Sequence, residues 1–210
     1  MIRTIVVLTK AVTHNGPYVT GIDINTGRWV RLAKSTASQC QLTPNGDLQC
    51  KPMQYEDGGF CQVLDVIEAD VETVSDGAEP DMVVYVSESL PRKLMKFHLR
   101  DVLVIRPSEK QDHLFGNCEN SVSQEEYKFL KSHLALVEVS NLSINPHEGH
   151  HPKMDFWYNG IHFENIYVAD NDYTSLTEHF HADNAALVMA VADDPYEGRH
   201  YKFIARVFTV

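Results

Sequence analysis

Hydrophobic residues recur along this chain in short runs rich in β-branched and aromatic side chains, and clusters of turn-forming residues separate the runs. This alternation predicts β-strands. In the front half the runs lie at 3–12, 18–24, 28–32, 61–71 and 97–106, with a weaker one at 82–86. In the back half they lie at 134–144, 154–158, 161–169, 186–192 and 201–210.

Two hairpin turns and one helix start are marked by specific residues. Asn25-Thr26-Gly27 is a three-residue loop that ends in glycine, and Asn159-Gly160 is a strong signal for a two-residue turn. Ser123 and Glu126 have the spacing of a capping box, which predicts a helix that runs to about His133.

About five short antiparallel strands in each hundred residues fit a small Greek-key barrel. The predicted fold is therefore mainly β, with two small five-stranded barrels in tandem and a connecting helix. The expected domains are a first barrel at 1–110, a connector with the helix at 111–133 and a second barrel at 134–210. A single larger sandwich is the alternative.

The opening segments TIVVLTKAV (4–12) and GPYVTGIDINTGRWVRL (16–32) resemble the start of the bacterial dual OB domain family. The tail HYKFIARVF and the stretch Val168–Asp170 are similar to that family more loosely. The resemblance implies two OB-like barrels in one chain and a nucleic-acid or nucleotide binding role. It supplies no catalytic residues.

The first hairpin offers a candidate binding face. With Asn25–Gly27 as the loop, Asp23 pairs with Trp29 and Gly21 with Arg31, which places Trp29 and Arg31 on the face opposite the apolar one. An indole beside a guanidinium would form a platform on which the bases of single-stranded nucleic acid stack. The alternatives are that segment 35–59 covers Trp29, or that a one-residue slip exchanges the two faces.

The charge distribution refines this picture. The net charge of −11 argues against a partner recognised by bulk positive charge. Along the chain, however, segments 1–34 and 91–106 each carry +4, whereas 35–90 carries −10 and 107–210 carries −9. Candidate phosphate contacts from the two basic segments are Arg28, Lys34, Lys93, Lys96 and Arg100. The alternative is that these cations form an ordinary solvated face.

The second hairpin has the same layout with acidic flanks. Around Asn159-Gly160, Trp157 and His162 share one face with Asp155 and Glu164, which would repel phosphates. This pattern favours a packing or protein-contact surface.

Signals for chemistry are weak. His179, His181 and Asp183 alternate and would share one face of a strand as metal ligands, with His147, His150 and His151 in a loop nearby, but there is no HExxH motif. The sequence has no GxSxG, P-loop or GxGxxG motif, so we expect no enzyme activity and no cofactor. Cys40, Cys50, Cys61 and Cys118 include no CxxC pair, which favours reduced thiols, although a disulfide among the first three stays open.

The sequence therefore predicts a cytoplasmic module that binds single-stranded nucleic acid or a nucleotide through its first barrel. No signal peptide or membrane partner is expected, because the start lacks a secretory pattern and no apolar run could span a bilayer. The first alternative is a protein-interaction or scaffold module of a bacterial defence or regulatory system. The second is a metal-dependent hydrolase centred on His179, His181 and Asp183.

Overall fold

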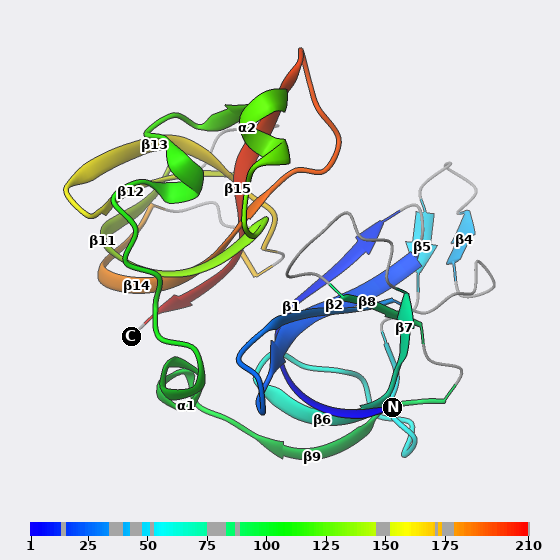
Figure 1. Cartoon of the computed structure of the whole chain (residues 1–210). Coiled ribbons are helices and arrows are strands. Elements are labelled where there is room, and N and C mark those ends of the chain that lie inside the picture. The colour runs from blue at the N-terminus through cyan, green and yellow to red at the C-terminus, as the bar shows by residue number, and fades with distance from the viewer. Residues whose placement is uncertain are drawn as a thin grey trace. The chain divides into compact units, whose positions relative to one another are not determined.

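The computed structural model describes residues 1–13, 16–33, 40–42, 48–50, 53–74, 83–86, 89–145, 152–170, 172–173 and 179–209. The chain divides into two compact units, Met1–Arg106 and Pro107–Val210. Each unit is built around a β-barrel (Figure 1), so the mainly β fold with two barrels is confirmed and the single larger sandwich is wrong. No helix in the described part of the chain is long and apolar enough to cross a membrane.

The described residues of the first unit form nine strands, seven of which belong to one sheet. They are β1 (Ile2–Thr13), β2 (Gly16–Asp23), β3 (Trp29–Ala33), β4 (Cys40–Leu42), β5 (Leu48–Cys50), β6 (Asp65–Asp70), β7 (Glu72–Val74), β8 (Val83–Val86) and β9 (Arg92–Lys96). The short strands β4 and β5 pair only with each other and place the backbone of Cys40 opposite that of Cys50.

The sheet of the first unit closes on itself. Strand β1 pairs antiparallel with β2 and β6, β2 pairs with β3, and β3 pairs in parallel with β8. Strands β6 and β7 are separated only by Val71, and they pair with β9 and β8 respectively. The run β6–β7 therefore serves as the fourth strand of a five-stranded barrel, and β8 and β9 together serve as the fifth.

Alternate residues of these strands fill the inside of the barrel. The buried cluster there includes Ile5, Val7, Val19, Val30, Leu32 and Ile67. Val30 and Leu32 point inward, so their neighbours in β3 point outward, as the period of two requires. Gly21 faces this cluster at a point where a side chain has no room, since a Cβ would lie 2.1 Å from the Val6 carbonyl oxygen.

The prediction of a strand at 97–106 is wrong. These residues form α1 (Leu99–Ile105), a seven-residue helix that follows the shorter strand β9. The Asp101 carboxylate accepts a hydrogen bond from the His98 backbone N–H, which closes a capping box at the helix start. This cap and the burial of Val102 outweigh the β-propensity of the Val and Ile residues.

In the second unit, the part of the chain that the structure describes forms six strands and two short helical elements. They are the 3₁₀ turn η2 (Leu114–Gly116), β10 (Ser121–Ser123), α2 (Gln124–Lys128), β11 (Leu134–Asn145), β12 (Lys153–Tyr158), β13 (Ile161–Val168), β14 (Phe180–Val191) and β15 (Arg199–Thr209). The closed ring runs β11-β12-β13-β15-β14 and back to β11, with β13 and β15 parallel. Strand β10 extends it beyond β15.

The capping box of the second unit is confirmed, although its helix is shorter than expected. The Ser123 hydroxyl accepts from the Glu126 N–H, and the Glu126 carboxylate accepts from the Ser123 N–H. The hydrogen bond that the Glu126 carboxylate accepts from the Ser123 N–H, together with one from the Asn117 side-chain amide, lowers the pKa of Glu126 to about 2. The helix ends at Lys128 instead of His133. His133 and His200 are buried where their rings stack against Tyr127, at centroid distances of 4.2 and 3.8 Å.

Candidate nucleic-acid interface

Strands β2 and β3 form the predicted hairpin, but their register differs by one residue from the prediction. Ile22 lies opposite Trp29 and Thr20 lies opposite Arg31, whereas Asp23 and Gly21 were expected there. Gly27, with a φ of 66°, does adopt the left-handed conformation expected at the end of the loop.

Asp23 explains the shift. Its buried carboxylate accepts hydrogen bonds from the backbone N–H groups of Asn25 (2.9 Å) and Thr26 (3.2 Å), and it forms an ion pair with Arg3 (2.7 Å). These contacts make an Asx turn that starts the loop directly after Asp23. The loop therefore runs from Ile24 to Gly27, the Asp23 N–H donates across it to the Arg28 carbonyl oxygen at 2.9 Å, and β3 begins at Trp29.

Trp29 does point away from the barrel core, as predicted, but it is not an exposed platform. Its side chain is 0% exposed, so the prediction that it stacks on bases is wrong for this structure. Cross-strand pairs place Val66, Val6, Ile22 and Trp29 in one row over four strands, and all four are buried. This stretch of the sheet is thus buried on both faces, whereas the prediction assumed that one face is in contact with solvent.

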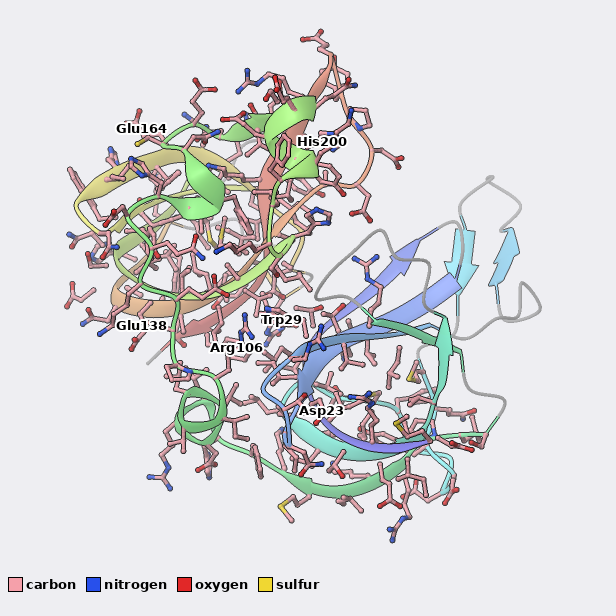
Figure 2. The ribbon with its side chains drawn as sticks, in the orientation of Figure 1. Asp23, Trp29, Arg106, Glu138, Glu164 and His200 are labelled. Atoms are coloured by element: carbon pink, nitrogen blue, oxygen red, sulfur yellow. The ribbon has the colours of Figure 1, made fainter. Side chains whose placement is uncertain are left out.

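Arg106 holds Trp29 from the end of α1. Its guanidinium carbon lies 5.2 Å from the centroid of the indole ring, and Nη1 donates a hydrogen bond to the Gly27 carbonyl oxygen at 2.7 Å (Figure 2). A Cβ on Gly27 would lie 3.4 Å from the Ile105 carbonyl oxygen. The C-terminal end of α1 therefore lies against the β2–β3 turn, next to Arg28.

The cations predicted to contact phosphates differ in whether they form ion pairs within the protein. Lys93 forms an ion pair with Asp65 at 2.7 Å, and that carboxylate is fully buried. Tyr55 and the Gln62 N–H donate to the other oxygen of Asp65. Burial raises the pKa of Tyr55, and its hydrogen bond to Asp65 acts in the same direction. Lys93 is 40% exposed, but its amine is thus tied to a buried polar network centred on Asp65.

Three of the remaining candidates lie at the surface. Lys96 is exposed at the end of β9, Arg100 is exposed in the first turn of α1, and Arg28 is exposed beside the other end of that helix. Asp101 is 3.9 Å from Arg100. Arg31 is half-buried, and Lys34 lies outside the described residues.

Strand β9 has a feature that the sequence did not reveal: all five of its residues are exposed. Leu94 and Met95 lie among its cations, and Arg92 pairs with Glu68 at 2.9 Å. The signal that could have found this surface is the segment RKLMK, in which no alternation separates apolar from charged positions.

The second hairpin matches its prediction closely. Asn159 and Gly160 have φ values of 50° and 77°, as a type I′ turn requires, and Trp157 lies opposite His162. The two rings stack at a centroid distance of 4.7 Å and an interplanar angle of 15°. Trp157 is 41% exposed, so it is this tryptophan that faces solvent.

The three metal candidates that the structure describes, His179, His181 and Asp183, do not gather into a ligand group. His181 Nε2 lies 3.2 Å from Asp183 Oδ1, and both side chains and that of His179 are exposed. No group of three potential ligands occurs within the described ranges, and His147, His150 and His151 lie outside them.

Cys61 is a buried free thiol and Cys118 an exposed one.

The barrel topology agrees with a comparison of the sequence with protein families. The family of dual OB-containing domains matches residues 3–207, nearly the whole chain. The chain belongs to this family. Its two units are therefore OB domains, and β2–β3 and β12–β13 are the second and third strands of the two barrels.

Two other comparisons add little to this assignment. A search of curated proteins found no match. Among solved structures, a murine DNA-binding protein bound with double-stranded DNA aligns over 100% of this chain and 96% of that one, at 9% identity and a TM-score of 0.36. A likeness this low supports no inference about fold or ligand.

Proposed function

We propose that this dual OB domain protein binds nucleic acid, and that the first unit contacts phosphates through Lys96, Arg100 and Arg28. The observation that supports this most is a row of exposed cations along β9 and α1 of an OB barrel. We call Lys96, Arg100 and the neighbouring Arg28 the cationic border. OB barrels recurrently bind oligonucleotides on their outer faces and loops. The proposal replaces the Trp29 platform with a cationic border and keeps the first barrel as the binding unit.

Lys93 contributes little to this border as a phosphate ligand, because its amine is held by Asp65 at 2.7 Å. Lys34 remains a candidate from the sequence alone. Arg31, half-buried on β3, is a weaker candidate than Arg28, since its guanidinium has less access to a ligand.

The proposed ligand is single-stranded. The longest described helix has seven residues, and an element that reads duplex DNA is commonly a longer helix laid in the major groove. A curved barrel with cations along one border is better suited to follow the flexible backbone of a single strand.

Fluorescence anisotropy with labelled 20-nucleotide DNA and RNA, single-stranded and duplex, tests the proposal over a salt series. We expect the double variant Lys96→Ala/Arg100→Ala to bind more weakly and to lower the slope of log K against log salt by about 1.4. Lys131→Ala removes an exposed cation from the second unit and should leave the affinity and the salt slope unchanged. Absence of binding at low salt, or equal losses in the control, would contradict the proposal.

A further inference from the structure

The outer face of β11, β12 and β13 in the second unit carries an exposed aromatic pair surrounded by carboxylates. We call it the Trp157 face and define it by Glu138, Ser140, Asp155, Trp157, His162 and Glu164. Strand pairing places Ser140, Trp157 and His162 side by side in one row across the three strands.

Each of these three strands contributes one carboxylate two residues away from the row. They are Glu138 on β11, Asp155 on β12 and Glu164 on β13. Residues two apart in a strand share a face, and the inward neighbours Val137, Val139, Phe156 and Phe163 belong to the core. Glu138 and Glu164 are exposed on the outside of the unit (Figure 2). Trp157 is therefore flanked by carboxylates in both directions along the strands.

The ring of His162 stacks on one side of the Trp157 indole, and Trp157 stays 41% exposed. Stacking on His162 fixes the orientation of Trp157 before any ligand arrives, which reduces the side-chain entropy lost on binding. Such a surface offers a π system with negative charge around it. That combination attracts a flat cation and repels a phosphate.

We propose that the Trp157 face docks an arginine-bearing segment of a partner protein. A guanidinium stacks on the indole, and its N–H groups reach Glu164 or Glu138 as hydrogen-bond acceptors. Lys153 is the one lysine of β12, and it lies opposite Tyr167, four residues from Trp157. Asp155 accepts a hydrogen bond from the Asn165 backbone N–H at 2.6 Å, and a Glu164 carboxylate oxygen lies 3.4 Å from His162 Nδ1, so both carboxylates are held beside the aromatic pair. This surface is separate from the cations proposed to bind nucleic acid, and the two proposals stand or fall independently.

The test is fluorescence anisotropy of the full chain with a labelled peptide of six Arg-Gly repeats, compared with six Lys-Gly repeats. We expect the arginine peptide to bind more tightly than the lysine peptide. Trp157→Ala should weaken the arginine peptide about tenfold, and Glu164→Gln should weaken it measurably. The matched control is Glu125→Gln, which removes an exposed carboxylate from α2 and should change nothing.

The control variants separate docking from general attraction to an acidic protein, because Trp157→Ala leaves the net charge unchanged. Unchanged affinity in Trp157→Ala, equal losses in Glu125→Gln, or no binding at low salt would overturn the proposal. Trp157-dependent binding of the 20-nucleotide single strands, or a dimer that Trp157→Ala dissociates in analytical ultracentrifugation, would also overturn it in favour of another occupant. Circular dichroism melting of each variant checks that the fold is retained.

Discussion

The guanidinium of Arg106 lies over the indole of Trp29, with 5.2 Å between the Arg106 Cζ and the ring centroid, and it is anchored to the Gly27 carbonyl. This contact joins the residue after α1 to the first residue of β3. It turns a tryptophan that the sequence pattern places on an outer face into a structural residue of the first unit.

Arg106→Ala removes both the cation–π contact and the hydrogen bond to Gly27. We expect the first unit to lose about 1 to 2 kcal/mol of unfolding free energy. The protein has two tryptophans, so a Trp157→Phe background makes Trp29 fluorescence a specific probe of urea unfolding. Arg106→Lys, which keeps the charge without the planar group, should recover only part of the loss. An unchanged midpoint in Arg106→Ala would show that the contact contributes nothing.

Lys93 and Lys96 lie on the same strand and should respond oppositely to substitution. Lys93→Met leaves the buried Asp65 carboxylate without its cation, and we expect a loss of about 2 to 4 kcal/mol in unfolding free energy. Lys96→Met should leave stability within about 0.5 kcal/mol, because its side chain is exposed. Urea unfolding monitored by Trp29 fluorescence measures both.

A companion variant checks the cause of the Lys93 effect. Asp65→Asn removes the buried negative charge and keeps an acceptor for Tyr55 and the Gln62 N–H. In the Lys93→Met background, this change should restore part of the lost stability. A further loss in the double variant would contradict the ion-pair explanation.

Gly21→Ala should be strongly destabilising although the backbone there does not need glycine's conformational range. The added Cβ would lie 2.1 Å from the Val6 carbonyl oxygen and 2.8 Å from Ile5 Cγ2, so β1 and β2 must separate locally. We expect a loss of about 2 to 4 kcal/mol by urea unfolding. Gly160→Ala, which meets no atom within 4 Å but has a φ of 77°, should cost about 1 kcal/mol. Equal effects at the two positions would argue against the close approach.

The buried Cys61 thiol should make stability fall at alkaline pH. Burial raises its pKa from 9.0 to about 11, so the folded state keeps the thiol proton over a range in which the unfolded state has lost it. The unfolded state then binds fewer protons between pH 9 and 11, and the stability present in full below pH 9 is lost across that window. The contribution is about 3 kcal/mol at most.

The comparison of wild type with Cys61→Ala isolates this effect from Lys202. Burial lowers the pKa of the Lys202 amine to about 8, which makes stability rise with pH between about 8 and 10.5. Unfolding free energies measured from pH 8 to 11 should show a steeper decline in wild type than in Cys61→Ala. Parallel curves would contradict the assignment.

In the folded protein, site-resolved mass spectrometry should find Cys118 alkylated before Cys61.

Local signals in the sequence predicted the features that depend on few residues. The capping box of Ser123 and Glu126, the turn at Asn159-Gly160 and the outward direction of Trp157 are all decided by contacts within six residues. The two barrels followed from the spacing of strands and from the resemblance of the first thirty residues to the family.

The features that were missed depend on pairings between distant segments. The register of β2 and β3 depends on Arg3, twenty residues before Asp23, and the burial of Trp29 involves Arg106, far along the chain. The engagement of Lys93 depends on the bulged register of β6 and β9, which no pattern within either strand reveals. Candidate binding residues were therefore identified by charge, but the sequence could not distinguish a structural cation from an available one.

Both barrels are completed by a parallel pair between their third and fifth strands, and this affects how the protein folds during synthesis. Val30 pairs with Val83 in the first unit and Tyr167 with Phe203 in the second, so neither ring closes until a long segment has been made. Such non-local pairing slows folding. All strand partners of the first ring lie within the first 106 residues, so this ring has every partner it needs once that segment leaves the ribosome, before most of the second has been translated.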